Sequence, residues 1–467
     1  MKKIKKINPN SSLTEVNHFI KEEITRLKEG HRIEHDVFYQ AVEEVLLSIA
    51  PLYLSDEKYF KNAIVKRLAV PDRIIKFKVE WLDDNNEIQV NTGYRVQFNN
   101  SLGPYKGGLR FHPSVNEGIL KFLGFEQILK NALTGLPIGG GKGGSDFDPK
   151  GKSDFEVMKF CSAFMKELHK YIGPRMDVPA GDIGVGAREI GYLFGEYKKI
   201  TSTFDGVLTG KPFFFGGSLA RTEATGYGVV YFTEAMLETE NRESLQGKIC
   251  TVSGAGNVAL HTIEKLLQLG AIPVTCTDSR GTIYDARGVD IEFLKDLKFN
   301  RRGSLEEYVV KHPEATYIPV SEYPKGGHAV WNIECYAAFP CSTQNELTEI
   351  DANNLIANGC VSVSEGANMP STTEAIETFL KNKISFAPAK AANAGGVAVS
   401  NFEMSQNASM IKWSFEEVDA KLKVTMQDIC KNIAETAREY GVEGNYVDGA
   451  NIAGFKRVAD AMIAEGI

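Results

Sequence analysis

The sequence predicts an α/β protein of two domains, the second built on a doubly wound parallel sheet. Three observations lead to this class. The chain has 467 residues, more than a single hydrophobic core serves at roughly 100–200 residues per domain. Residues 11–133 combine helical spacing with one alternating hairpin pattern. From residue 248 to about residue 400, strand and helix patterns follow one another, which is typical of a parallel sheet.

In the first half, apolar residues recur at helical spacing through residues 11–50, so we expect opening helices. The pattern alternates from Arg73 to Asn99, with a turn at residues 83–86, and predicts a β-hairpin. Residues 101–150 are rich in glycine and contain one helical segment, 116–133. Helical patterns return over 154–200, with an expected loop at 174–186.

In the second half, we expect a glycine- and aromatic-rich stretch at 206–227 to form a hinge between the domains. After it we expect a strand at 248–253, a helix at 257–269 and a strand at 272–278. Further strands and helices follow to about residue 400, and a long helical region closes the chain.

Composition excludes several classes of protein. The formal net charge is −7 and no basic stretch offsets it, so nucleic acid is not an expected partner. No apolar run approaches the roughly 20 residues that cross a bilayer, so we expect no membrane partner. The lysine-rich start is not followed by the apolar core of a signal peptide, and seven scattered cysteines form no Cys-x-x-Cys pair. We therefore expect a cytoplasmic protein with reduced thiols.

A glycine motif follows the strand at 248–253 and opens the next helix. Gly254 permits a tight turn, Gly256 lets a pyrophosphate approach the backbone, and the small Ala259 allows close packing of the helix on the strand. Asp278 ends the next strand, 24 residues after Gly254. This context predicts a Rossmann-like dinucleotide site, whereas an ordinary glycine turn is the alternative.

The residues after that strand bear on the choice of coenzyme. Asp278 favours the ribose hydroxyls of NAD, whereas Ser279 and Arg280 can donate to the 2′-phosphate of NADP. The chemistry alone is ambiguous and leans to NADP. A solvated turn is the alternative role for Arg280.

Three lysines lie in or beside glycine-rich segments of the first half: Lys106, Lys130 and Lys142. We expect their ammonium groups to converge on a ligand that bears carboxylates. A lysine confined in a dehydrated pocket beside other cations loses its proton more easily, so Lys142 could act as a general base. The alternative is a set of flexible loops with solvated lysines. The run GGGKGGS does not match a P-loop, because Leu136 and Gly143 stand at two required positions.

Asp182 lies in a loop before a helix, within VPAGDIGVGAREIG. Such a carboxylate either caps the helix or carries protons in catalysis. The segment His31-Arg32-Ile33-Glu34-His35 matches a zinc-protease pattern. However, it lies in a charge-rich helix with no evident third ligand, so we expect no metal site.

The chain as a whole resembles the hexameric glutamate dehydrogenases of the Glu/Leu/Phe/Val dehydrogenase family. The resemblance runs from about residue 50 to the C-terminus. It is carried by GPYKGGLRFHPSVN, FEQILKNALTGLPIGGGKGGSDFDP, DVPAGDIGVGAREIG, GVLTGK, EATGYG, PCSTQNE, EGANMPSTTEA, NAGGVAVSNFEMSQN and GANIAGFKRVADAM. The first 50 residues match least well, so no function is carried onto them.

The resemblance implies a substrate-binding and oligomerisation domain at 1–215, rejoined by a C-terminal helix at 435–467. A dinucleotide-binding domain at 216–434 lies between them in the chain, and the active site is expected in the cleft. The resemblance implies that Lys142 and Asp182 are catalytic. It implies that the substrate γ-carboxylate is bound by Lys106 and Ser400, and the α-carboxylate end by Gln127, Lys130 and Gly181. The implied coenzyme-binding residues are Thr225, Gly254, Gly256, Asn257, Asp278, Ser279, Arg280, Ser342, Gln344 and Asn345.

The implied reaction is the reversible oxidative deamination of L-glutamate to 2-oxoglutarate and ammonia, with hydride transfer to NADP. Asp278-Ser279-Arg280 resembles the NADP-type members, which tilts the expected role toward ammonia assimilation by a cytoplasmic homohexamer. Three alternatives stay open: an NAD-dependent glutamate dehydrogenase, a dehydrogenase of another amino acid, and a silent relative that binds ligand. Intact Lys142 and Asp182 count against the last of these.

Overall fold

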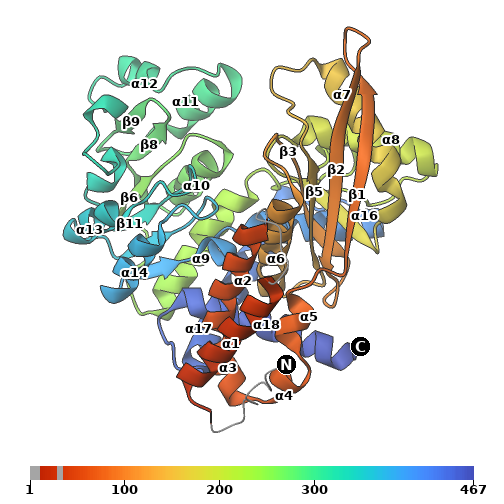
Figure 1. Cartoon of the computed structure of the whole chain (residues 1–467). Coiled ribbons are helices and arrows are strands. Elements are labelled where there is room, and N and C mark those ends of the chain that lie inside the picture. Colours follow the sequence, from red (N-terminus) through yellow and green to blue (C-terminus); the bar gives the residue numbers. More distant parts are fainter. Residues whose placement is uncertain (1–10, 29–34, 467) are drawn as a thin grey trace. The chain divides into compact units, whose positions relative to one another are not determined.

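The computed structural model describes residues 11–28 and 35–466. These residues divide into two compact units (Figure 1). Unit 1 comprises the described residues within Met1–Leu219, Val399–Phe415 and Asn451–Ile467, and unit 2 comprises Ala220–Ala398 and Glu416–Ala450. The sequence analysis places all of residues 399–434 in the second domain. Those domain boundaries stay a prediction. Each unit is described separately.

Unit 1 opens with helices, as the apolar spacing predicts. The five described helices are α1 (Leu13–Lys28), α2 (Asp36–Ser48), α3 (Ala50–Ser55), α4 (Lys58–Lys61) and α5 (Ile64–Leu68). The predicted hairpin is also confirmed, because β1 (Arg73–Leu82) pairs antiparallel with β2 (Ile88–Asn99).

A five-stranded sheet forms the centre of unit 1, in the order β1-β2-β4-β3-β5. β3 (Tyr105–Phe111) runs parallel to both of its neighbours, β4 (Gly140–Ser145) and β5 (Asp177–Gly181). The loop expected at 174–186 is therefore wrong in part, since β5 lies within it. The short run Asp-Val-Pro-Ala-Gly shows no alternation, because its first four residues are all buried in this edge strand, which pairs parallel with β3.

Three long helices accompany this sheet. They are α6 (Glu117–Leu133), α7 (Asp154–Leu168) and α8 (Ala187–Thr201). α6 begins as predicted after Asn116, whose side chain accepts a hydrogen bond from the Ile119 amide at 2.9 Å. Such an N-cap satisfies a donor that the first helical turn leaves open. Two short 3-10 turns complete the region, at His169–Tyr171 and Phe213–Phe215.

Unit 2 contains the predicted doubly wound parallel sheet. Five parallel strands lie in the order β13-β12-β11-β6-β7. They are β6 (Ile249–Val252), β7 (Ile272–Pro273), β11 (Ala337–Phe339), β12 (Ser362–Ser364) and β13 (Ser385–Ala387). The helices between β-strands and before α16 (Gly395–Ser409) in this unit are α9 (Ala224–Thr239), α10 (Asn257–Gln268), α11 (Ile291–Lys295), α12 (Glu306–Lys311), α13 (Glu349–Ala357), α14 (Thr373–Lys381) and α15 (Ala389–Ala392). Short helical turns lie at Asp296–Asn300, Val320–Glu322 and Ala329–Asn332.

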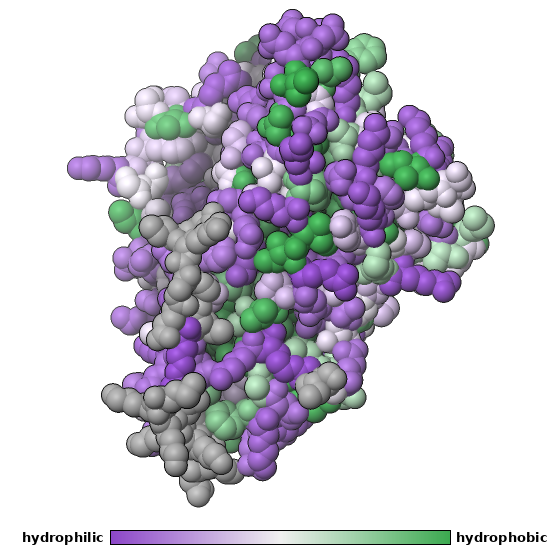
Figure 2. All heavy atoms as spheres, turned by 45° about the vertical axis from the view of Figure 1, so that its right-hand side comes forward, coloured by the Kyte–Doolittle hydropathy of each residue, from purple (hydrophilic) through white to green (hydrophobic). Residues whose placement is uncertain are grey.

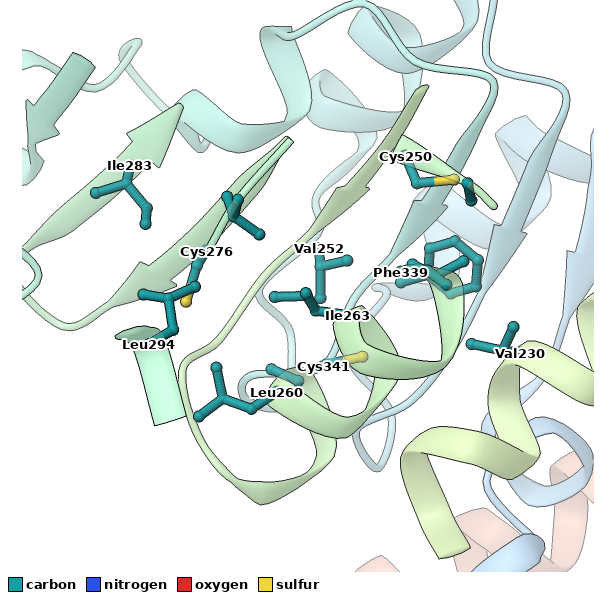
Figure 3. Close-up of a cluster of buried hydrophobic side chains, with 14 of the residues drawn as sticks. Val230, Cys250, Val252, Leu260, Ile263, Cys276, Ile283, Leu294, Phe339 and Cys341 are labelled. Carbon is teal, nitrogen blue, oxygen red and sulfur yellow. The ribbon is translucent and has the colours of Figure 1, made fainter. Parts of the chain in front are cut away.

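Apolar side chains fill both faces of this sheet. One cluster contains Val252 and Phe339 from the strands and Leu260 and Ile263 from α10 (Figure 3). The second contains Ala338 from β11 and Leu355 from α13. Neighbouring residues of β11 thus enter different clusters, because successive side chains of a strand point to opposite faces.

The sequence predicts one strand at 272–278, but the structure has two separate strands there. β7 ends at Pro273, which has no N–H for a strand ladder. β8 (Thr275–Asp278) then pairs with β9 (Gly281–Tyr284), and β10 (Thr316–Pro319) completes a separate antiparallel sheet. Ser279 and Arg280 therefore form the two-residue turn of a hairpin.

The chain closes with α16 (Gly395–Ser409), α17 (Phe415–Glu439) and α18 (Tyr446–Glu465). The single helix expected at 435–467 is thus interrupted at residues 440–445, where Gly441 and Gly444 have positive φ angles of 74° and 81°. Arg457 of α18 donates to the carbonyls of Ala132 and Gly135, both at 2.6 Å. None of the described helices is both long and apolar enough to span a bilayer. Figure 2 shows hydrophilic residues over most of the face that it presents.

Close packing of α6 on β4 gives a first prediction. A Cβ atom on Gly140 would lie 2.8 Å from the backbone Cα of Ile128, so Gly140→Ala should destabilise the protein by about 1–3 kcal/mol through overpacking. Gly195 on α8 has no such neighbour within 4 Å, and Gly195→Ala should be stabilising by roughly 0.5–1 kcal/mol. Thermal unfolding of the two variants measures both effects. Equal stability of the two would contradict this account of the packing.

Candidate active site

The parallel strands of unit 1 bring three predicted residues onto neighbouring elements. Lys106 lies near the start of β3, opposite Val178 of β5. Lys142 lies in β4, opposite Val96 of β2. Asp182 follows Gly181, the last residue of β5, which pairs with Leu109 of β3. Residues far apart in the chain thus become neighbours in one sheet.

Lys142 and Asp182 form an ion pair. Lys142 Nζ lies 3.0 Å from Asp182 Oδ2, and the two side chains are 9% and 17% exposed. A second cation, Arg110 of β3, donates from Nε to the same oxygen at 3.0 Å. Burial alone would raise the pKa of Asp182, but the charges and hydrogen bonds of Lys142 and Arg110 outweigh it and hold the pKa below its usual range. Asp182 is therefore a carboxylate at neutral pH.

The alternative that Asp182 caps α8 is wrong. The N-cap of α8 is Gly186, and Glu189 accepts the Gly186 N–H at 2.8 Å. Asp182 instead receives both of its side-chain partners from neighbouring strands. From its loop, Asp182 therefore contacts cations of neighbouring strands and does not cap the helix.

Lys106 is buried, at 2% exposure. Its Nζ donates to Thr209 Oγ1 at 2.7 Å, and the Thr209 amide donates to the carbonyl of Pro179 in β5 at 2.9 Å. The next amide, Gly210, donates to Glu403 of α16 at 2.9 Å. Buried Ser400 lies one turn before Glu403 on that helix. A chain of contacts therefore connects Lys106 to the turn of α16 next to Ser400.

α6 carries Gln127 and, one turn later, Lys130. Gln127 Nε2 donates to Asn131 Oδ1 at 2.7 Å, and Asn131 Nδ2 donates to the carbonyls of Lys106 at 3.1 Å and Gly139 at 2.5 Å. These bonds tie α6 to β3 and to the segment before β4. Gln127 and Lys130 are therefore held on a helix fixed beside the strands of Lys106 and Lys142.

Unit 2 carries the predicted coenzyme residues. Gly254, between β6 and α10, has φ +90°, and a Cβ there would lie 3.0 Å from the carbonyl of Cys341. Gly256 is different, because its φ of −91° is ordinary and no protein atom lies within 4 Å of a Cβ. The protein itself does not require glycine at Gly256, and open space at the start of α10 fits a pyrophosphate. Asn257 Nδ2 donates to the carbonyl of Thr222 at 2.7 Å.

A cation that the sequence analysis missed, Lys298 of the helical turn Asp296–Asn300, contacts the hairpin at the end of β8. Asp278 Oδ1 accepts the Arg280 amide at 3.0 Å, and Asp278 Oδ2 lies 3.1 Å from Lys298 Nζ. Ser279 and Arg280 are exposed. Because Lys298 offsets the charge of Asp278, the turn can accept a phosphate as well as a ribose hydroxyl.

The remaining predicted residues lie on loops or helix starts of unit 2. Thr225 lies in the first turn of α9, where its hydroxyl would be 2.6 Å from a Cβ on Gly396. Gln344 and Asn345 lie on an exposed loop after β11. Glu346 accepts the Ser342 amide at 2.9 Å within that loop, and burial raises the pKa of Glu346 to about 7.

The possible zinc pattern is described only in part, because residues 31–34 lie outside the described residues. His35 precedes α2, 3.5 Å from Glu117. Within the described part of the chain, no group of three His, Cys, Asp or Glu side chains could hold a metal ion.

Three contacting residues were missed by the sequence analysis: Arg110, Thr209 and Lys298. Two lie inside motifs that carried the resemblance, namely GPYKGGLRFHPSVN and GVLTGK. Arg110 is the second charged residue of the first motif, after Lys106, and this could have identified it as a candidate site residue. Nothing local distinguishes Lys298, whose contact with Asp278 exists only after folding.

Comparisons with known proteins identify the family of this chain. The profile of the Glu/Leu/Phe/Val dehydrogenase dimerisation domain matches residues 71–199, and that of Glutamate/Leucine/Phenylalanine/Valine dehydrogenase matches residues 216–466. An NADP-specific glutamate dehydrogenase of Helicobacter pylori is 62% identical over 430 residues, covering 92% of this chain and 96% of the relative. An NAD(P)-specific glutamate dehydrogenase of Xylanibacter ruminicola is 56% identical over 433 residues, with the same coverages.

Among solved structures, glutamate dehydrogenase of Plasmodium falciparum superposes with a TM-score of 0.92 at 49% identity. The match covers 98% of this chain and 97% of that one. The resemblance seen in the motifs is thereby confirmed along nearly the whole length. The chain belongs to the Glu/Leu/Phe/Val dehydrogenase family.

Proposed function

We propose that this chain is an NADP-dependent glutamate dehydrogenase. It interconverts L-glutamate, water and NADP⁺ with 2-oxoglutarate, ammonia and NADPH, and its physiological direction is the reductive amination of 2-oxoglutarate. The observation that carries the proposal is the Lys142–Asp182 pair, which lies in the same sheet as the buried cation Lys106. The high identity to relatives named for this activity supports it.

The lysines of unit 1 bind the two carboxylates of the substrate. Lys106, with Ser400, binds the γ-carboxylate, while Lys130, Gln127 and the backbone around Gly181 bind the α-carboxylate end. A buried ammonium group loses much of its favourable energy when no anion pairs with it. Substrates with apolar side chains, such as leucine, are therefore disfavoured at Lys106.

Lys142 and Asp182 move the protons of the reaction. Asp182 takes a proton from the substrate ammonium group, and Lys142, as an amine, takes one from the water that attacks the iminium carbon. Asp182 then returns its proton to the nitrogen. The hydroxyl proton of the carbinolamine then passes to the departing nitrogen, which leaves as ammonium. Lys142 releases its own proton to solvent, so each oxidative turnover releases one proton.

The coenzyme, when bound, accepts or supplies the hydride at the α-carbon. Gly254 and Gly256 would hold its pyrophosphate, and Thr225, Asn257, Ser342, Gln344 and Asn345 would line the nicotinamide and its ribose. Ser279 and Arg280 hold the 2′-phosphate, and Lys298 keeps the Asp278 carboxylate from repelling it. This last contact supports NADP over NAD.

The chain forms a homohexamer through its first domain. Support comes from apolar side chains exposed on and near the β1–β2 hairpin, such as Ile88 at 72%, Val90 at 60% and Phe155 at 68%. They lie inside the region matched by the dimerisation-domain profile. The cytoplasm is its compartment, since all seven cysteines are buried free thiols.

A direct assay tests the activity. Purified protein mixed with 2-oxoglutarate and ammonium should oxidise NADPH, with a higher kcat/KM than for NADH. The loss of absorbance of the reduced nicotinamide measures the rate. Omission of ammonium is the control, and an absence of turnover with both coenzymes would overturn the proposed function.

Specificity for a diacid depends on Lys106. Lys106→Leu should lower kcat/KM for glutamate on the order of 100-fold or more, because an anion loses its buried partner, and should improve that for norleucine. Lys121→Leu is a matched control, since Lys121 is also a buried lysine of unit 1 but lies over the ring of Phe38 at 4.5 Å. An unchanged preference in Lys106→Leu would show that the γ-carboxylate is bound elsewhere.

Coenzyme preference depends on Arg280. Arg280→Ala should weaken NADPH binding roughly 10-fold, as expected for one charge-assisted hydrogen bond, with little effect on NADH. Titration of nicotinamide fluorescence measures both affinities. Arg287→Ala, which removes another exposed arginine of unit 2, serves as the control. Equal losses for the two coenzymes would contradict a 2′-phosphate contact.

A further inference from the structure

Arg110 contacts the same carboxylate oxygen as Lys142. Both nitrogens lie 3.0 Å from Asp182 Oδ2, so they are no more than twice that distance apart. Neither the second oxygen of Asp182 nor the rest of the Arg110 guanidinium has a partner among residues 11–28 and 35–466. One oxygen is thus fixed by two cations, and Oδ1 is left for another proton donor or acceptor.

The backbone of Arg110 is also fixed. Arg110 pairs with Gly144 of β4, and the strands approach so closely that a Cβ on Gly144, which has φ +153°, would collide with the Arg110 carbonyl. An arginine anchored in the middle of a sheet can hold a carboxylate in one orientation.

The two cations differ in how they respond to the reaction. Lys142 must lose its proton to accept one from water, and its attraction for Asp182 then falls. An arginine keeps its charge throughout the working pH range. Arg110 therefore continues to pair with Asp182 when Lys142 is neutral.

We propose that Arg110 is the positioning residue of this proton-transfer pair: it holds Oδ2 of Asp182 through the whole cycle, so that Oδ1 exchanges the proton with the substrate nitrogen. This inference rests on the proposed function. It explains why the carboxylate has two cationic partners, although a single lysine would neutralise its charge. The two carboxylate oxygens therefore have different roles: Oδ2 binds the cations and Oδ1 exchanges the proton.

Other charged groups lie on the elements around Asp182. Lys106 shares β3 with Arg110, and Lys130 lies on α6. On α8, Arg188 and Glu189 pair with each other. Asp177 of β5 is bound by the fully buried Arg95. Among the residues that the structure describes, the charged groups in direct contact with the Asp182 carboxylate are Lys142 and Arg110.

The test compares the pH dependence of kcat in wild type, Arg110→Gln and Arg110→Lys. Wild-type Asp182 has a lowered pKa, so its carboxylate form persists to low pH. Without the charge of Arg110 this pKa rises, and the acid limb of the profile should move to higher pH by about 1 unit or more. In Arg110→Gln, kcat should fall more than KM changes. Arg110→Lys keeps the charge, so its acid limb should stay close to that of wild type while kcat falls.

Arg188→Gln is the matched control, because it removes an arginine charge on α8 that pairs with Asp154 and Glu189. Its profile should equal that of wild type. If Arg110→Gln fails to fold, as judged by thermal unfolding and NADPH binding, Arg110→Met replaces it as the uncharged variant.

The two proposals fail separately. An active wild type, with the same acid limb in wild type and in the uncharged variant, overturns the role of Arg110 and leaves the proposed function intact. An inactive wild type that binds NADPH overturns the proposed function itself.

Discussion

A buried carboxylate between two cations is the interaction on which the candidate site depends. Asp182 is only 17% exposed, and an isolated carboxylate with so little contact with water would favour its protonated form. Lys142 and Arg110 reverse this tendency. In return, the carboxylate neutralises cations that would otherwise repel one another and the neighbouring lysines. Each of these buried charges is therefore stabilised by the opposite charge beside it.

The close approach of β3, β4, β5 and α6 makes this group possible. Glycines in β4 are required by the protein's own packing, as at Gly140 against α6 and at Gly144 against Arg110. These glycines let the strands and the helix approach closely, so that Lys142 has a fixed backbone beside Asp182. A lysine on a rigid strand needs little reorganisation when the reaction moves a proton.

Much of the architecture could be predicted from local patterns. The hairpin at residues 73–99 and the parallel sheet of unit 2 have clear apolar periodicity. β3 and β4 escaped prediction because their sequences, YKGGLRF and GGKGGS, have no apolar alternation. The break at Pro273 was missed because apolar residues continue on both sides of it.

The predicted site contained the residues whose local sequence is unusual, such as Lys142 among glycines. Its omissions are residues that matter only through contacts distant in sequence. Arg110 meets Asp182 across 72 residues, and Lys106 meets Thr209 across 103. No periodicity or spacing within a motif encodes such pairs, because they depend on strand order and register.

The most direct test of the account is a crystal structure of the protein with 2-oxoglutarate. We predict that one carboxylate contacts Lys106 Nζ, the other contacts Lys130 Nζ, and the keto carbon lies beside Lys142 and Asp182 Oδ1. A diacid bound in unit 1 without contact to Lys106 and Lys130, or one bound only elsewhere, would contradict the account.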